Sequence, residues 1–193
     1  MNFSAWNTLE VAKLLVGFLT PCLLAGLGIY IHRVTKRFED SQWRSQKLVE
    51  KRLEIYSDLA PHFNDLLCYF TFIGGWKELD PPSVISLKRV LDKKIYLAAP
   101  LFSDDFLSCC TQFQSLCFET YNAWGFDARL RTFSGPREAV LAEKWDSNWS
   151  NLFADDDTTD PAEIQNAYKN VMDCFSREIG IHKSVTVAGK QSS

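Results

Sequence analysis

The longest uncharged run in the chain covers residues 14–31, between Lys13 and the pair His32-Arg33. As a helix this run would be about 27 Å long, close to the roughly 30 Å of bilayer hydrocarbon. It is apolar on all sides, which disfavours an amphipathic core helix. Glu10 and Lys13 cancel before it and no small-residue cleavage site follows, which disfavours a secretory signal. The pattern therefore predicts a membrane-spanning helix over 14–31, with these span residues: Leu14, Phe18, Pro21, Cys22, Gly26 and Ile31.

The charges that flank this span predict its orientation. Arg33, Lys36 and Arg37 follow it, whereas only Lys13 and the α-amino group precede it. By the positive-inside rule we expect a single-pass protein of the cell inner membrane, with residues 1–13 as a short extracytoplasmic tail. Residues 32–48 form a basic juxtamembrane helix in this interpretation, and everything after it is cytoplasmic.

Two features inside the span bear on the shape of the helix and on its association with a second helix. Pro21 removes a backbone donor, so it can kink the helix. Cys22 and Gly26 are small residues four positions apart, a spacing that allows two helices to approach closely. Self-association of the span into a homo-oligomer is therefore one open expectation, beside the ordinary abundance of glycine and proline in membrane helices.

Behind the juxtamembrane helix, apolar residues repeat at helical spacing. The seam recurs every three or four residues, which is typical of a helix packed in a bundle. Leu59, Leu66 and Ile73 widen it on one side, and Pro61 predicts a kink or a new helix. The seam consists of Val49, Leu53, Tyr56, Ala60, Phe63, Leu67 and Phe70.

Start signals predict the helices that follow. Asp80-Pro81 and Asp160-Pro161 each place a capping carboxylate before a proline at the first helical position. Ser103 is a third cap, before a helix whose inner face is Phe106, Cys110, Phe113, Cys117, Tyr121 and Trp124, with Gly125 as its end. Residues 138–153 form another helix, with Trp145 and Trp149 on one face. The fold class is all-α: a transmembrane helix, then a cytoplasmic helical bundle of four to five helices over 49–180, and a flexible tail over 181–193.

The stretch from Leu66 to Trp76 has two interpretations. It is uncharged and rich in large apolar residues, which suits either the core or a segment that inserts into the membrane. Eleven residues are too few to span a bilayer as a helix, which favours the core. The other interpretation stays open, and under it the candidate membrane-active or partner-binding residues are Leu66, Phe70, Phe72 and Trp76.

A second candidate site follows Gly125. Asp127, Arg129 and Arg131 alternate with large apolar residues and could recognise an anionic group or a partner. Structural ion pairs that tie this loop to the bundle explain such arrangements more often.

Composition adds mainly exclusions. The net charge of −3 gives no case for direct nucleic-acid binding. The six cysteines lack metal-ligand spacing, and their apolar settings suggest reduced thiols in a reducing compartment. The three histidines are scattered, and no nucleophile motif or phosphate-binding glycine loop is present. We therefore expect no enzyme, no metal and no cofactor.

The order of features resembles the small transmembrane effector proteins of bacterial retron defence systems. The similarity rests on the N-terminal span, on 51–56 (KRLEIY) up to Pro61, on 75–79 (GWKEL) before Pro81-Pro82, and on 127–131 (DARLR). It implies a toxin of antiviral, abortive-infection defence that a reverse transcriptase with RNA-linked single-stranded DNA keeps silent. Once released, the effector would perturb the inner membrane.

Such effectors are often described with two spans, and only one is convincing in this sequence. Residues 59–76 are where a second could lie.

Two other functions remain open. A non-toxic, membrane-tethered adaptor would recruit a cytoplasmic partner through the helical domain. An unrecognised membrane-bound enzyme would need Asp127, Arg129 or the Cys109-Cys110-Cys117 group to face a cavity.

Overall fold

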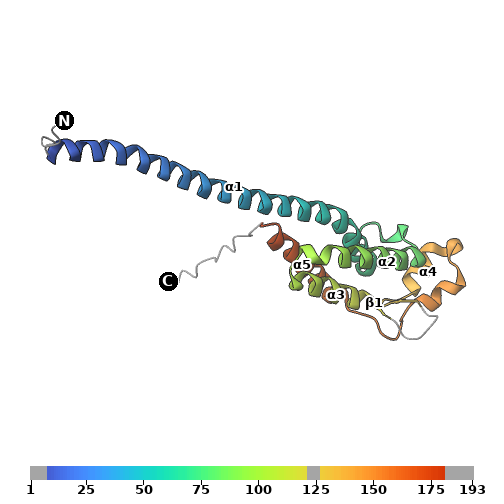
Figure 1. The fold of residues 1–193 in the computed structure, drawn as a ribbon. Coiled ribbons are helices and arrows are strands. Elements are labelled where there is room, and N and C mark those ends of the chain that lie inside the picture. Colours follow the sequence, from blue (N-terminus) through green and yellow to red (C-terminus); the bar gives the residue numbers. More distant parts are fainter. Residues whose placement is uncertain (1–7, 121–126, 181–193) are drawn as a thin grey trace, which may run out of the picture. The chain divides into compact units, whose positions relative to one another are not determined.

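The computed structural model describes residues 8–120 and 127–180 of the chain and is mostly helical. Its all-α class agrees with the sequence, apart from one short pair of strands (Figure 1). The chain divides into two units, residues 1–47 and residues 48–193. The predicted tail 181–193 lies outside the described residues.

Helix α1 (Thr8–Thr71) contains the expected span, the juxtamembrane segment and the first part of the bundle. It already begins within the segment predicted to be a tail. The sequence predicts a kink or a new helix at Pro61, and of these the new helix does not form, because α1 continues through this residue. Proline there removes one backbone hydrogen bond, to the carbonyl of Ser57, and packing of the surrounding apolar face compensates for that loss.

The buried face of α1 is rotated slightly from the predicted seam. Leu53 is 47% exposed, whereas Leu59 and Leu66, expected at the edge, are fully buried. Aromatic residues of two other helices cover this side: Phe175 contacts Tyr56, and Phe113 contacts Phe63. A heptad pattern finds the apolar half of a helix, but the partners determine which line of residues lies at its centre.

A left-handed turn ends α1. Phe72 has φ +59°, and the N–H of Ile73 donates to the carbonyl of Cys68 at 3.2 Å, as in a Schellman motif. Gly74 also has positive φ, and a Cβ there would lie 3.1 Å from the sulfur of Cys68. The chain thus leaves the helical conformation at Phe72, two residues before the first glycine. A short 3-10 helix, η1 (Trp76–Glu78), follows.

Three helices complete the core at the positions that their start signals indicate. They are α2 (Pro81–Ala98), followed by η2 (Ala99–Leu101), then α3 (Asp104–Cys117) and α5 (Pro161–Glu178). The Asp80 carboxylate accepts from the N–H of Ser83, and Asp160 accepts from that of Ala162, so both predicted caps are confirmed. Helix α3 packs chiefly against α5.

The predicted continuation of α3 is wrong. The helix ends at Cys117, and β1 (Phe118–Glu119) pairs antiparallel with β2 (Arg129–Leu130). The spacing that suggested a longer helix used Tyr121 and Trp124, which lie outside the described residues together with Gly125. Pairing with a strand ten residues ahead is a non-local interaction that helical periodicity does not register.

The predicted helix over 138–153 is also wrong. The chain forms α4 (Gly135–Leu141), then two 3-10 helices, η3 (Ala142–Lys144) and η4 (Ser147–Leu152). Ala142 has φ +44°, which no α-helix accommodates. Asp146 then accepts from the N–H of Asn148 and starts η4. Trp145 packs edge-to-face on Trp149 and contacts the core.

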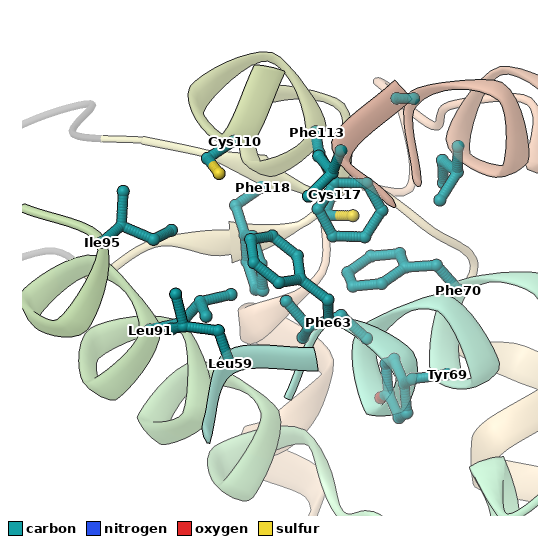
Figure 2. Close-up of a cluster of buried hydrophobic side chains, with 14 of the residues drawn as sticks. Leu59, Phe63, Tyr69, Phe70, Leu91, Ile95, Cys110, Phe113, Cys117 and Phe118 are labelled. Atoms are coloured by element: carbon teal, nitrogen blue, oxygen red, sulfur yellow. The ribbon is translucent and has the colours of Figure 1, made fainter. Parts of the chain in front are cut away.

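The core of the second unit is aromatic (Figure 2). Phe63 of α1 packs edge-to-face on Phe113 of α3, with ring centroids 5.5 Å apart. Phe70 makes a similar contact with Phe118. Cys110 and Cys117 are fully buried beside these rings, so they act as small apolar residues.

Candidate functional site

The predicted span forms a helix with exposed apolar side chains. Its most apolar 18-residue window has mean hydropathy 1.7, and none of it is buried. Phe18 is 72% exposed and Leu23 64% exposed. Pro21, Cys22, Gly26 and Ile31 also lie within α1; Leu14 does too, but its side chain lies outside the description. By length and composition this helix can cross a membrane.

Near Pro21, the backbone carbonyls of the span depart from the usual helical hydrogen bonding. Pro21 leaves the carbonyl of Gly17 without its usual helical donor. One residue earlier, the Thr20 hydroxyl donates to the carbonyl of Val16 at 2.7 Å. A Cβ built at Gly26 or Gly28 meets no described atom within 4 Å. This side of the helix is therefore open for lipid or another helix.

The candidate membrane-active segment lies in and beside the core of the second unit. Leu66 and Phe70 are buried, whereas Phe72 and Trp76 are half-buried. The rings of Phe72 and Trp76 contact each other edge-to-face. Insertion of this segment into a bilayer would require Leu66 and Phe70 to leave their packed positions, so the structure favours its interpretation as core.

Asp127, Arg129 and Arg131 each pair with a different element and form no common site. Asp127 forms an ion pair with Arg89 of α2, and Arg129 pairs across the strands with Glu119 at 2.8 Å. Arg131 donates to the carbonyl of Ser115 and to the carboxylate of Asp157. These contacts correspond to the structural interpretation of the motif. Exposed pairs of this kind contribute about 0–1 kcal/mol each.

Arg137 is the charged side chain that the sequence analysis missed. It is 1% exposed, and its guanidinium donates to the carbonyls of Tyr69 and Phe133 at 2.5 and 2.7 Å, and to the Thr132 hydroxyl at 3.1 Å. The cation also lies over the rings of Tyr69 and Phe72, 4.1 and 4.4 Å from their centroids. Burial lowers the pKa of Arg137 and raises that of Tyr69.

The position of Arg137 explains its role. Tyr69 lies in the last turn of α1, where carbonyls lack helical partners and the helix dipole is negative. A buried cation there donates to a carbonyl that the helix leaves without a partner, and so holds α4 against the end of α1. One signal was present in the sequence: Arg137 lies near the start of a helix, where positive charge is unfavourable.

A second missed cluster joins α1 to α5. Arg52 donates to the carbonyl of Leu101 at 2.6 Å and pairs with the Glu178 carboxylate at 2.9 Å. Glu178 also accepts from the N–H of Ser103, the residue before α3, at 3.0 Å, whereas the Ser103 side chain makes no capping hydrogen bond. Burial raises the pKa of Glu178, but the bonds from Ser103 and the charge of Arg52 outweigh it and hold the pKa below its usual range.

No arrangement typical of a catalytic or metal centre is found in the part of the chain that the structure describes. It contains no group of three His, Cys, Asp or Glu residues placed to hold a metal. A groove of about 240 Å³ lies between α1 and α2, and its lining is mostly apolar, including Ile55, Leu59 and Leu97. Asp127, Arg129 and Cys109 do not line this groove.

Comparison with known proteins gives no assignment: no family model, no curated protein and no solved structure matches this chain.

Proposed function

We propose that the chain is a single-pass membrane protein anchored by residues 14–31. The observation that carries this proposal is the exposed apolar surface of the span, where ten large apolar side chains between Leu15 and Ile31 face outward. Removing each from water gains about 1.5–3 kcal/mol. Together they represent about 15–30 kcal/mol, more than the roughly 5–15 kcal/mol that holds a typical domain folded. A bilayer supplies that burial along the whole helix.

The charges after the span support an orientation with the N-terminus outside and the helical domain in the cytoplasm. Arg33, Lys36 and Arg37 lie within two turns of its end. The cysteines of the second unit are free thiols, which suits a reducing compartment. The proposed location is therefore the cell inner membrane.

In that membrane, the proposed activity is the one implied by the resemblance to retron effectors. The chain would be held silent by a reverse transcriptase with RNA-linked single-stranded DNA, and would perturb the membrane after release. The exposed span and the open surface at Gly26 support this, because membrane perturbation requires apolar helices that can associate.

The test is expression of the full chain alone in bacteria, with membrane potential and growth as readouts. Wild type should depolarise the cells, and co-expression of the reverse transcriptase with its RNA should prevent this. Leu23→Arg should abolish the effect, because an arginine at the centre of a span costs about 2.5–3.5 kcal/mol. Leu97→Arg is the matched control, since Leu97 is 70% exposed on α2. Normal polarisation and growth at high expression of wild type would overturn the proposal.

The alternative is a harmless, membrane-tethered adaptor. One observation favours it: the second unit has its own core, built from α1 residues beyond 55, α2, α3 and α5. A domain with its own core can present a binding surface without contributing to membrane damage. In the same experiment the adaptor predicts full polarisation with wild type and release from the membrane with Leu23→Arg.

A further inference from the structure

Two thiols from different helices lie in direct contact. The sulfur of Cys109 on α3 is 2.8 Å from the sulfur of Cys174 on α5, although 65 residues separate them in the sequence. Cys109 is half-buried, whereas Cys174 is only 2% exposed. The sulfur atoms need to approach by only about 0.8 Å to reach the roughly 2.05 Å of a disulfide bond.

A cation adjoins this pair. Arg177, one turn after Cys174 on α5, donates to the Cys174 sulfur at 3.0 Å. A neighbouring guanidinium stabilises the thiolate form of a cysteine. Burial, together with the hydrogen bond and charge of Cys174, raises the pKa of Cys109 to about 11. Cys174 is therefore the sulfur that the guanidinium contacts, whereas the raised pKa keeps the proton on Cys109.

We propose that Cys109 and Cys174 form a redox-sensitive thiol pair that closes to a disulfide on exposure to hydrogen peroxide. Contact between two sulfurs, a cation on one of them and partial exposure of the other are the features of reversible thiol switches. The other buried thiols, Cys110 and Cys117, are fully enclosed in the core. This inference does not rest on the proposed function.

The chemistry has two steps. The Cys174 thiolate attacks one peroxide oxygen, the O–O bond breaks, and the products are a sulfenic acid at Cys174 and hydroxide. The Cys109 sulfur then attacks the Cys174 sulfur, the S–O bond breaks, and the departing hydroxide takes up the Cys109 proton and leaves as water. The two sulfurs lose two electrons in total, and one peroxide is reduced to one water and one hydroxide. The hydroxide becomes a second water when it takes up the proton that Cys174 released on forming its thiolate.

The consequence is a covalent link between α3 and α5. In a reducing compartment the pair rests as two thiols, so the disulfide forms only under oxidative stress and is reversed by cellular reductants. Because the link closes a long loop, it should raise the melting temperature of the domain by on the order of 10 °C.

The experiment uses the full chain in non-ionic detergent micelles, treated with hydrogen peroxide, quenched in acid, unfolded and labelled with a maleimide polymer. The chain has six cysteines. Labelling should fall from six thiols to four, dithiothreitol should restore it, and peptide mapping should show the Cys109–Cys174 link. Cys68→Ser, the matched control, should still lose two thiols.

Variants test the assigned roles. Cys109→Ser should form no disulfide but should trap sulfenic acid at Cys174, detected with dimedone. Cys174→Ser should leave Cys109 unmodified. Arg177→Gln should slow disulfide formation by peroxide about tenfold, yet leave diamide able to close the bond, and circular dichroism should show each variant folded. Six labelled thiols after peroxide treatment of wild type, or a link between another pair, would overturn the proposal.

Discussion

Replacement of Arg137 by methionine tests whether this buried cation stabilises the domain. Methionine keeps most of the aliphatic volume but removes the charge and every donor. The carbonyls of Tyr69 and Phe133 then lose their charged donor in a site that water does not reach. Arg137→Met is also the informative choice because methionine leaves no charge behind in the core.

The expected magnitude can be worked out from the interactions that this substitution removes. Each buried carbonyl left without a donor costs about 1–3 kcal/mol, and loss of the cation from the faces of Tyr69 and Phe72 costs about 2 kcal/mol. Relief from burying a charge returns several kcal/mol. We therefore expect Arg137→Met to lower the free energy of unfolding by about 3 kcal/mol, or the melting temperature by roughly 6–12 °C.

The assay is thermal unfolding of the full chain in micelles, followed by far-ultraviolet circular dichroism. Arg89→Met provides the matched control, because Arg89 is 62% exposed in its pair with Asp127. Its effect should stay below about 1 kcal/mol. If Arg137→Met melts within a degree of wild type, the cost of burying the cation cancels its favourable interactions, and the proposed role of Arg137 at the end of α1 is wrong.

Two further predictions concern Glu178 and the helix caps. Because the folded pKa of Glu178 is depressed, its contribution is complete above the ordinary glutamate pKa of about 4.3 and is lost as pH falls through the folded pKa. Glu178→Gln should therefore be less stable than wild type at pH 7 and should lose less stability between pH 5 and 3; parallel curves of stability against pH would contradict this. Asp80→Ala should cost about 1 kcal/mol, whereas Ser103→Ala should cost only a few tenths, because the Ser103 hydroxyl makes no capping hydrogen bond and alanine keeps the N–H that Glu178 accepts. Equal losses in the two cap variants, measured by melting temperature, would show that the Ser103 hydroxyl does cap α3.

Capping residues and apolar spacing correctly predicted those helices whose ends and buried faces depend on residues close together in the sequence. A carboxylate before a proline marks the starts of α2 and α5, because the cap and the fixed proline φ act within four residues. Apolar spacing located the buried face of α3 at Phe106, Cys110, Phe113 and Cys117, because helical periodicity is also a local signal. The failures occurred where a partner distant in sequence decides, as at Phe118, which pairs with Leu130 instead of continuing α3. Ala142 is a different case: its positive φ has no glycine to announce it.

For the candidate sites too, the outcome depends on partners that are distant in the sequence. A common site was predicted at Asp127, Arg129 and Arg131 because their charges are close in sequence. In the structure each of these residues pairs with a different part of the chain. Arg137 stands alone in sequence among ordinary neighbours, and its carbonyl partner at Tyr69 is 68 residues away. Isolated charges become important through burial, which depends on the tertiary fold.

A single span, as proposed, would limit how the chain can act on a membrane. The segment 14–31 contains no Asp, Glu, Lys, Arg or His, so one copy offers no charged path through the hydrocarbon. The apolar stretch around Leu66 and Phe70 is packed in the core of the second unit. Damage to the membrane would therefore require several copies whose spans assemble. The small side chains of Cys22 and Gly26 allow two spans to approach closely there. An adaptor requires only one copy, because anchoring depends on the burial of a single helix. The number of copies that associate in the bilayer is thus the physical quantity that separates the two proposed functions.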